Sequence, residues 1–162
     1  MQLDDLNRLD ADDAVRELRR CCGSTRWAQL MAAARPFANE AAMIDCADVI
    51  WWSLDAPDWL EAFSAHPKIG GPTTTRWSAQ EQSGMDSAAA AISDRLARGN
   101  REYEARFGYI FIICATGKSA AEMLEALERR LGNTPDRELG IAAGEQRAIT
   151  RLRLARLIEH RS

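Results

Sequence analysis

Histidines and paired metal-ligand motifs are scarce in this chain of 162 residues. It has two histidines and four cysteines, and no two cysteines follow a Cys-x-x-Cys spacing. A structural zinc site is therefore not expected, because such sites need four suitably spaced ligands. The adjacent pair Cys21-Cys22 is also a poor start for a disulfide framework. We expect reduced, buried thiols at these positions and at Cys46 and Cys114, since each lies in an apolar context.

Long apolar runs and an excess of basic residues are also missing. No run reaches the length needed to cross a membrane, and no basic-then-apolar stretch marks a leader peptide. A net charge of −3 gives no indication of nucleic-acid binding. The 46% apolar and 28% charged residues are typical of a soluble globular protein. We expect one cytoplasmic domain over residues 1–162, with neither nucleic acid nor a membrane as partner.

Helical periodicity and helix caps are what the sequence does contain. The recurrence of apolar residues at helical spacing predicts helices along nearly the whole chain. Capping side chains or prolines indicate helix starts at Asp10, Ser24, Asn39, Pro57, Ser78, Ser119 and Thr134-Pro135. These signals predict an all-α, single-domain bundle of about seven to eight helices.

A short apolar run of β type interrupts this pattern at residues 109–114, between Gly108 and Gly117. No second strand is evident to pair with it, so we expect a buried extended segment or the start of a helix. The helical stretch before it is expected to be weakened at Gly84 and bent at Gly99-Asn100.

One histidine lies where a helix is expected to end. Pro67 disfavours helical backbone at His66, so the imidazole should lie at the rim of that helix. An imidazole in such a place suits proton transfer near neutral pH. It would also suit a plainer role, the stabilisation of the last carbonyl groups of the helix.

The next expected helix begins with a polar cluster. Ser78-x-x-Glu81 matches a capping box, so a structural role would explain both residues. Free N–H groups at a helix start also bind anions, and Gln82 adds an amide that donates and accepts. A small anionic ligand there would meet all three side chains. Both interpretations stay open from the residues alone.

A late arginine shares a face with apolar side chains. Arg153 lies four residues after Ile149 and four before Leu157. Such an arginine either extends its head to water or binds a carboxylate with its forked donors. Arg151 is the alternative residue for the second role.

Several short motifs follow one another from about residue 20 to residue 157. They are Cys22-Gly23-Ser24, Arg35-Pro36-Phe37, Asp58-Trp59-Leu60, His66-Pro67 with Ile69-Gly70, Ser78-x-x-Glu81-Gln82, Asn100-x-x-Tyr103, Phe107-Gly108-Tyr109-x-Phe111-Ile112-Ile113-Cys114-Ala115, Arg130-Leu131-x-Asn133 and Arg153-Leu154. Each motif is weak alone. In this number and order the chain resembles the 2-oxo-4-hydroxy-4-carboxy-5-ureidoimidazoline (OHCU) decarboxylases of urate degradation.

The resemblance implies an all-α carboxy-lyase that needs no cofactor, often forms homodimers and yields (S)-allantoin. It implies that His66 and Glu81 are catalytic. The residues implied to contact the substrate are Pro67, Ser78, Gln82, Phe111, Ile112, Ile113, Cys114, Ala115 and Arg153. Lys68 departs from the acidic residue that some members carry after the His-Pro pair, and the loop from Lys68 to Trp77 is short.

Cofactor-free decarboxylation is chemically reasonable for this substrate. Most decarboxylases need a Schiff base, thiamine or a metal as electron sink, whereas a ring C=N beside the carbon that loses CO2 serves here. We expect His66 to contact the departing carboxylate and Glu81 to accept from the ring hydroxyl. Two other classes remain: a non-enzymatic helical module that binds a small anion or a peptide, and another lyase or hydrolase on the same scaffold.

Overall fold

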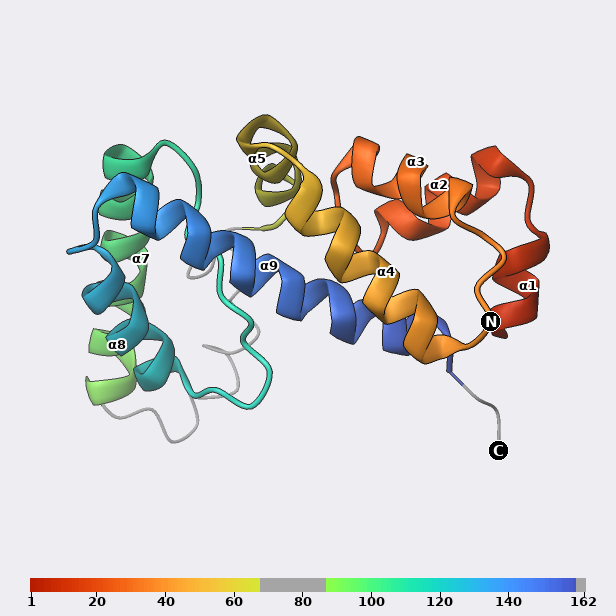
Figure 1. The fold of residues 1–162 in the computed structure, drawn as a ribbon. Coiled ribbons are helices and arrows are strands. Elements are labelled where there is room, and N and C mark those ends of the chain that lie inside the picture. Colours follow the sequence, from red (N-terminus) through yellow and green to blue (C-terminus); the bar gives the residue numbers. More distant parts are fainter. Residues whose placement is uncertain (68–86, 160–162) are drawn as a thin grey trace. The chain divides into compact units, whose positions relative to one another are not determined.

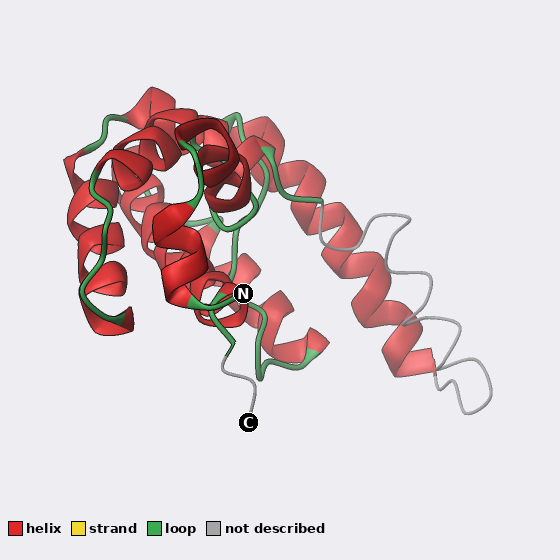
Figure 2. Ribbon diagram, turned by 90° about the vertical axis from the view of Figure 1, so that its right-hand side faces the viewer, coloured by secondary structure: helices red, strands yellow, loops and turns green. Residues whose placement is uncertain are grey.

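The computed structural model describes residues 1–67 and 87–159. Within these ranges every regular element is a helix, and loops and turns make up the rest (Figure 2). The helices are α1 (Leu3–Arg8), α2 (Ala11–Arg19), α3 (Thr25–Ala33), α4 (Glu40–Ser53), α5 (Ala56–Ser64), α7 (Ser87–Phe107), α8 (Ala120–Arg130) and α9 (Pro135–Leu157). The prediction of an all-α fold with about seven to eight helices is confirmed. None of these described helices is both long and apolar enough to cross a membrane.

Two compact units divide the chain. The first combines Met1–Ala65 with Ala143–Ser162, and the second is His66–Ala142. Helix α9 is continuous and contributes to both, because its residues up to Ala142 belong to the second unit and the rest to the first.

Helix caps in the first unit lie where the sequence predicts them. The side chains of Asp10, Ser24 and Asn39 each accept a hydrogen bond from a backbone N–H in the first turn of α2, α3 and α4. Such a cap satisfies one of the four N–H groups that a helix start leaves without a partner. Short helices such as α2 and α3 gain definite boundaries in this way, and α3 packs against both α2 and α4.

Buried tryptophans connect the helices of the first unit. Trp27 of α3 is fully buried, and its indole N–H donates to the carbonyl of Ala47 in α4 at 3.2 Å. Trp51 of α4 donates to the carbonyl of Ala143 in α9 at 2.9 Å. Each indole therefore buries a large apolar surface and also satisfies its single donor.

The second unit is built on α7 and α8, which lie side by side (Figure 1). Its buried core is formed by Leu96, Tyr103, Phe111, Ile113, Leu124, Ala126 and Leu127. Helix α7 continues through Gly99-Asn100, where the sequence predicted a bend. A Cβ atom at Gly99 would lie 2.5 Å from Cδ2 of Leu127, so the glycine serves the close approach of α8 and not a change of direction.

The run between α7 and α8 is neither helix nor strand. Phe111, Ile112 and Ile113 are buried and not helical, which confirms the expected burial and shows that the alternative of a helix start is wrong. Figure 1 shows it as a long open connection from the end of α7 to the start of α8. Gly108 and Gly117 flank it with φ angles of 84° and 78°, values in the left-handed region that favours glycine.

Two expectations about the first unit and the thiols need correction. Helix α1 was not expected from the sequence, although Asp4 and Asp5 in its first turn suit a helix start. All four cysteines are free, but only Cys21 and Cys22 are buried; Cys46 and Cys114 are partly exposed. The predicted burial is therefore wrong for the last two.

Candidate functional site

His66 follows the C-terminal end of α5, as the sequence predicts. The helix ends at Ser64 and its C-cap is Ala65. The imidazole is half-buried, whereas Pro67 is exposed. The proline after it cannot continue the helix, so the side chain leaves the helix end at a fixed point along the chain.

The end of α5 is held closely by the turn between α2 and α3. A Cβ atom at Gly23 would lie 2.5 Å from Cβ of Ala65 and 3.6 Å from Cα of Ala62. No larger residue fits there without a shift of one of the two segments. The position from which His66 departs is therefore fixed by a contact that only glycine permits.

A carboxylate on α5 strengthens the same junction. Glu61 accepts from the Thr25 backbone N–H at 2.8 Å and from the Thr25 hydroxyl at 2.7 Å. Thr25 is the first residue of α3, so Glu61 satisfies a free N–H group at a helix start and adds favourable charge there. Together with Gly23, this pair of hydrogen bonds sets the orientation of α5.

Arg153 lies on the part of α9 that belongs to the first unit. It is half-buried and borders a hollow of about 550 Å³, lined by Met1, Glu17, Arg20, Cys21, Arg153, Arg156 and Leu157. Three arginines and one glutamate line it, so the hollow favours an anionic group over a cationic one. Arg20 is exposed and already paired with Glu17 at 3.0 Å, and Arg156 is exposed as well. Arg153 is therefore the half-buried arginine among these lining residues.

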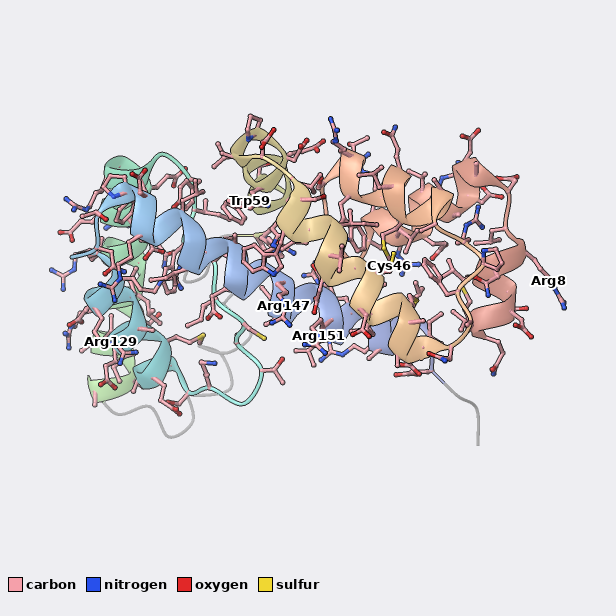
Figure 3. The ribbon with its side chains drawn as sticks, in the orientation of Figure 1. Arg8, Cys46, Trp59, Arg129, Arg147 and Arg151 are labelled. Carbon is pink, nitrogen blue, oxygen red and sulfur yellow. The ribbon has the colours of Figure 1, made fainter. Side chains whose placement is uncertain are left out.

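Arg151, the alternative, is placed differently. Its Nη1 lies 3.8 Å from the carboxylate of Asp48 in α4, and Arg147 binds the same carboxylate oxygen at 2.8 Å. Figure 3 shows Arg147 and Arg151 next to each other along α9. Arg151 is thus one of two arginines that share a surface ion pair, and Arg153 is the better candidate for a ligand.

The buried thiols near Arg153 have low reactivity. Burial raises the pKa of Cys21 to about 12, and the positive charge of Arg153 opposes part of this rise. Burial likewise raises the pKa of Cys22 to about 11, against hydrogen bonds from Ser24 and Thr150. Since the thiolate is the reactive form, neither cysteine is suited to be a nucleophile near neutral pH.

The segment expected to form the apolar wall belongs to the second unit. Phe111, Ile112 and Ile113 are buried, Cys114 is half-buried and Ala115 is exposed. The run therefore passes from the core of this unit to its surface within five residues. Only its later part has side chains within reach of solvent.

A buried charged network that sequence reasoning missed surrounds this segment. Arg130 of α8 and Glu138 of α9 form an ion pair of 2.6 Å, with 8% and 0% of their side-chain surfaces exposed. The Tyr103 hydroxyl donates to the same carboxylate oxygen, and Asn133 donates to the other at 3.0 Å. Burial and this contact raise the pKa of Tyr103. Arg130, Asn133 and Tyr103 do occur in the recognised motifs, but no spacing rule points to Glu138.

The remaining expected site residues lie outside the described part of the chain. These are Ser78, Glu81 and Gln82, and the expected interruption at Gly84 lies there too. Within residues 1–67 and 87–159, no three His, Cys, Asp or Glu side chains are grouped to hold a metal ion.

The fold and these features define a class, an all-helical protein with an imidazole at a helix end and a half-buried arginine beside a hollow. A family model for OHCU decarboxylase matches residues 7–155. The chain therefore belongs to the OHCU decarboxylase family. The recognition from sequence motifs is therefore confirmed: the chain belongs to a family of decarboxylases of urate degradation.

Individual relatives agree with the family assignment. The chain is 41% identical over 154 residues to the uric acid degradation bifunctional protein TTL of Arabidopsis thaliana, covering 90% of this chain but 48% of that protein. It is 33% identical over 136 residues to the OHCU decarboxylase of Amia calva, covering 77% and 75% of the two chains. The chain thus spans about half the length of the bifunctional relative.

Solved structures show the same fold. The crystal structure of an OHCU decarboxylase in the presence of (S)-allantoin is 43% identical, with a TM-score of 0.76 over 88% of this chain and 96% of that one. A crystal structure of an (S)-allantoin synthase has a TM-score of 0.73 at 19% identity, which supports the fold alone.

Proposed function

We propose that this chain converts 2-oxo-4-hydroxy-4-carboxy-5-ureidoimidazoline to (S)-allantoin, without a cofactor, in urate degradation. The family match over residues 7–155 is the observation that carries the proposal. The 43% identical structure was determined in the presence of (S)-allantoin, the product of this reaction. The half-buried imidazole after α5 supplies a group of the required chemistry.

The reaction breaks one carbon–carbon bond and forms one carbon–hydrogen bond. The substrate carboxylate leaves as CO2, and its electron pair forms a double bond to the neighbouring ring carbon while the nitrogen of the ring C=N takes up a proton. The hydroxyl then loses its proton and becomes a carbonyl, as a proton is delivered to one face of that neighbouring carbon and sets the S configuration. The protein's task is to orient the carboxylate, polarise the neighbouring hydroxyl and supply that proton from one side.

Each proposed residue has one part in this reaction. His66, with Pro67 beside the ligand, contacts the departing carboxylate and acts as acid or base. Glu81 accepts a hydrogen bond from the ring hydroxyl, while Ser78 and Gln82 fix the ring and the ureido group. The half-buried guanidinium of Arg153 holds negative charge. Backbone groups of the segment from Phe111 through Ile112, Ile113 and Cys114 to Ala115 bind the amide edge of the ring.

The enantiomer of the product tests the proposal directly. The intermediate is generated from urate with urate oxidase and hydroxyisourate hydrolase, and circular dichroism is followed with and without the chain. An excess of (S)-allantoin that grows with the chain's concentration is expected. An unchanged racemic product would favour the non-enzymatic helical module or a different substrate.

We further propose that residues 1–162 act as one catalytic domain in a cytoplasmic homodimer. An apolar surface supports the dimer: Val49 and Trp52 of α4 and Leu60 of α5 are exposed by 71%, 47% and 38%. Trp52 packs edge-to-face on Trp59 of α5 at 5.9 Å, so the exposed face of α4 contacts α5 at this ring. Sedimentation at twice the chain mass is expected, with Trp52→Glu shifting it to the monomer; a wild-type monomer would contradict the proposal.

A further inference from the structure

The 109–115 segment of the second unit has two unequal edges. The Ile112 carbonyl accepts from Nη1 of Arg130 at 2.7 Å, and the Cys114 carbonyl accepts from Nζ of Lys118 at 3.1 Å. Both acceptors therefore belong to the edge that faces this unit's own cations. Acceptors at every second residue match an extended chain, in which successive carbonyl groups point to opposite sides, and this pattern places those of Phe111 and Ile113 on the other edge.

That other edge has acceptors to offer. Among the described residues, the backbone groups of Phe111 and Ile113 have no hydrogen-bond partner. Buried backbone polar groups are almost always paired with protein, water or a ligand. Two carbonyl groups two residues apart on an extended chain lie roughly 6.5 Å from each other. Such a pair fits a flat ligand with several N–H donors.

Arg130 fixes which edge faces which way. Its Nε and Nη2 both donate to one oxygen of Glu138, at 2.8 and 2.6 Å, while Nη1 reaches Ile112. The guanidinium carbon also lies 4.5 Å from the centre of the Phe111 ring. One planar group is thus held by a carboxylate on one side and binds two successive residues of the segment on the other. A lysine could not do both, since its ammonium has neither the fork nor the plane.

Glu138 is oriented in turn by its own donors. The Tyr103 hydroxyl of α7 shares one oxygen with Arg130, and Nδ2 of Asn133 donates to the other. Helices α7, α8 and α9 therefore all contribute to the position of a single guanidinium. Three of the five guanidinium N–H groups thus have definite partners, two on Glu138 and one on the Ile112 carbonyl, and this defines the register of the segment.

We propose that Arg130, held by Glu138, is a positioning residue for substrate binding, because it turns the Phe111 and Ile113 carbonyls toward the N–H groups of the substrate's ureido and ring amide. This inference rests on the proposed function, since it takes the 111–115 segment as part of that site. Arg130 does not touch the substrate; it acts through Ile112 and Phe111.

A matched pair of arginine variants tests the proposal. Arg130→Lys keeps the positive charge but loses the fork. Arg106→Lys is the control, because Arg106 also donates to a carbonyl, that of Asn133 at 2.9 Å, and also lies over a ring, that of Phe107 at 5.1 Å. Neither of its contacts involves the segment. Each variant is measured for kcat, KM and the Kd of (S)-allantoin, well below its unfolding temperature.

Arg130→Lys is expected to raise KM and the Kd of (S)-allantoin by about tenfold while kcat changes little, a loss typical of a displaced binding contact. Arg106→Lys should leave all three unchanged. A lowered unfolding temperature with unchanged KM and Kd would show that the network serves stability only and would overturn the inference. A fall in kcat of Arg130→Lys with unchanged KM and Kd would also overturn the inference.

A second variant keeps the test decisive where Arg130→Lys does not fold. Tyr103→Phe retains the buried ring and removes one donor to Glu138, so a rise in KM of about threefold is expected. An unchanged KM in Tyr103→Phe overturns the inference. Wild-type chain that neither forms (S)-allantoin nor binds it would overturn the proposed function itself, and the inference with it. Activity in the wild type with normal KM in the variants would overturn the inference alone.

Discussion

Two regions of the molecule hold proposed site residues by different physical means. The end of α5, from which His66 departs, is held by close packing on Gly23 and by neutral donors of Thr25 on Glu61. The 109–115 segment is held by a buried ion pair with further hydrogen bonds. A packed junction can shift to admit an added group, at a cost of about 1–3 kcal/mol. A buried ion pair fails as a unit, because removing one partner leaves the other charge without compensation.

The largest effect is expected from breaking the buried pair. Glu138→Ala leaves the Arg130 guanidinium buried without its carboxylate, and such a change costs about 3–5 kcal/mol of unfolding free energy. Chemical denaturation followed by circular dichroism measures it.

The exposed pair of Arg95 and Glu128 provides the control in the same unit. Its side chains are 51% and 48% exposed. Glu128→Ala should therefore cost no more than about 1 kcal/mol. Equal losses in Glu138→Ala and Glu128→Ala would contradict the claim that the buried pair holds the second region.

A smaller loss is expected at the packed junction. Gly23→Ala places a methyl group against Ala65, so the turn or the end of α5 must shift, at a cost of about 1–3 kcal/mol. Because His66 follows that end, kcat should fall as well. Gly144→Ala is the control, since a Cβ there meets nothing within 4 Å, and it should add about 0.4–1 kcal/mol. A Gly23→Ala variant with normal stability and kcat would show that this junction does not position His66.

Alkaline pH should weaken both units, from different starting points. The pKa of Cys21 is raised to about 12 by burial, and that of Tyr103 is raised as well. A raised pKa means that the unfolded chain releases its proton first, so stability falls as pH rises past the unfolded value. The loss should begin near pH 9 for the thiols and about pH 10 for the tyrosine. Tyr103→Phe should reduce the later part of the loss; an unchanged profile in that variant would contradict this assignment.

The smallest effect concerns the two partly exposed thiols, one in each unit. At pH 8, iodoacetamide should label Cys46 and Cys114 before the buried Cys21 and Cys22. Since Cys114 belongs to the proposed substrate segment and Cys46 to α4, (S)-allantoin should slow labelling of Cys114 severalfold and leave Cys46 unchanged. Mass spectrometry of tryptic peptides gives both rates. Equal labelling of Cys114 with and without allantoin would show that the segment is not part of the substrate site.

Local signals made the first region more predictable from sequence than the second. The Ser24 cap and the end of α5 before His66-Pro67 depend on neighbours within four residues, which a sequence pattern contains. The pairing of Arg130 with Glu138 depends instead on how α8 and α9 meet around a loop. Gly99 was misread for the same reason, because the partner that requires it, Leu127, lies in another helix. The motifs indicated the proposed substrate segment but not the buried network that holds it.

The rate of optical change with and without His66 tests the central claim most directly. His66→Asn preserves size and hydrogen bonding but not proton transfer near neutral pH, so formation of (S)-allantoin should slow by about 10² to 10⁴, with an unchanged helical spectrum. A fully active His66→Asn chain would contradict the account.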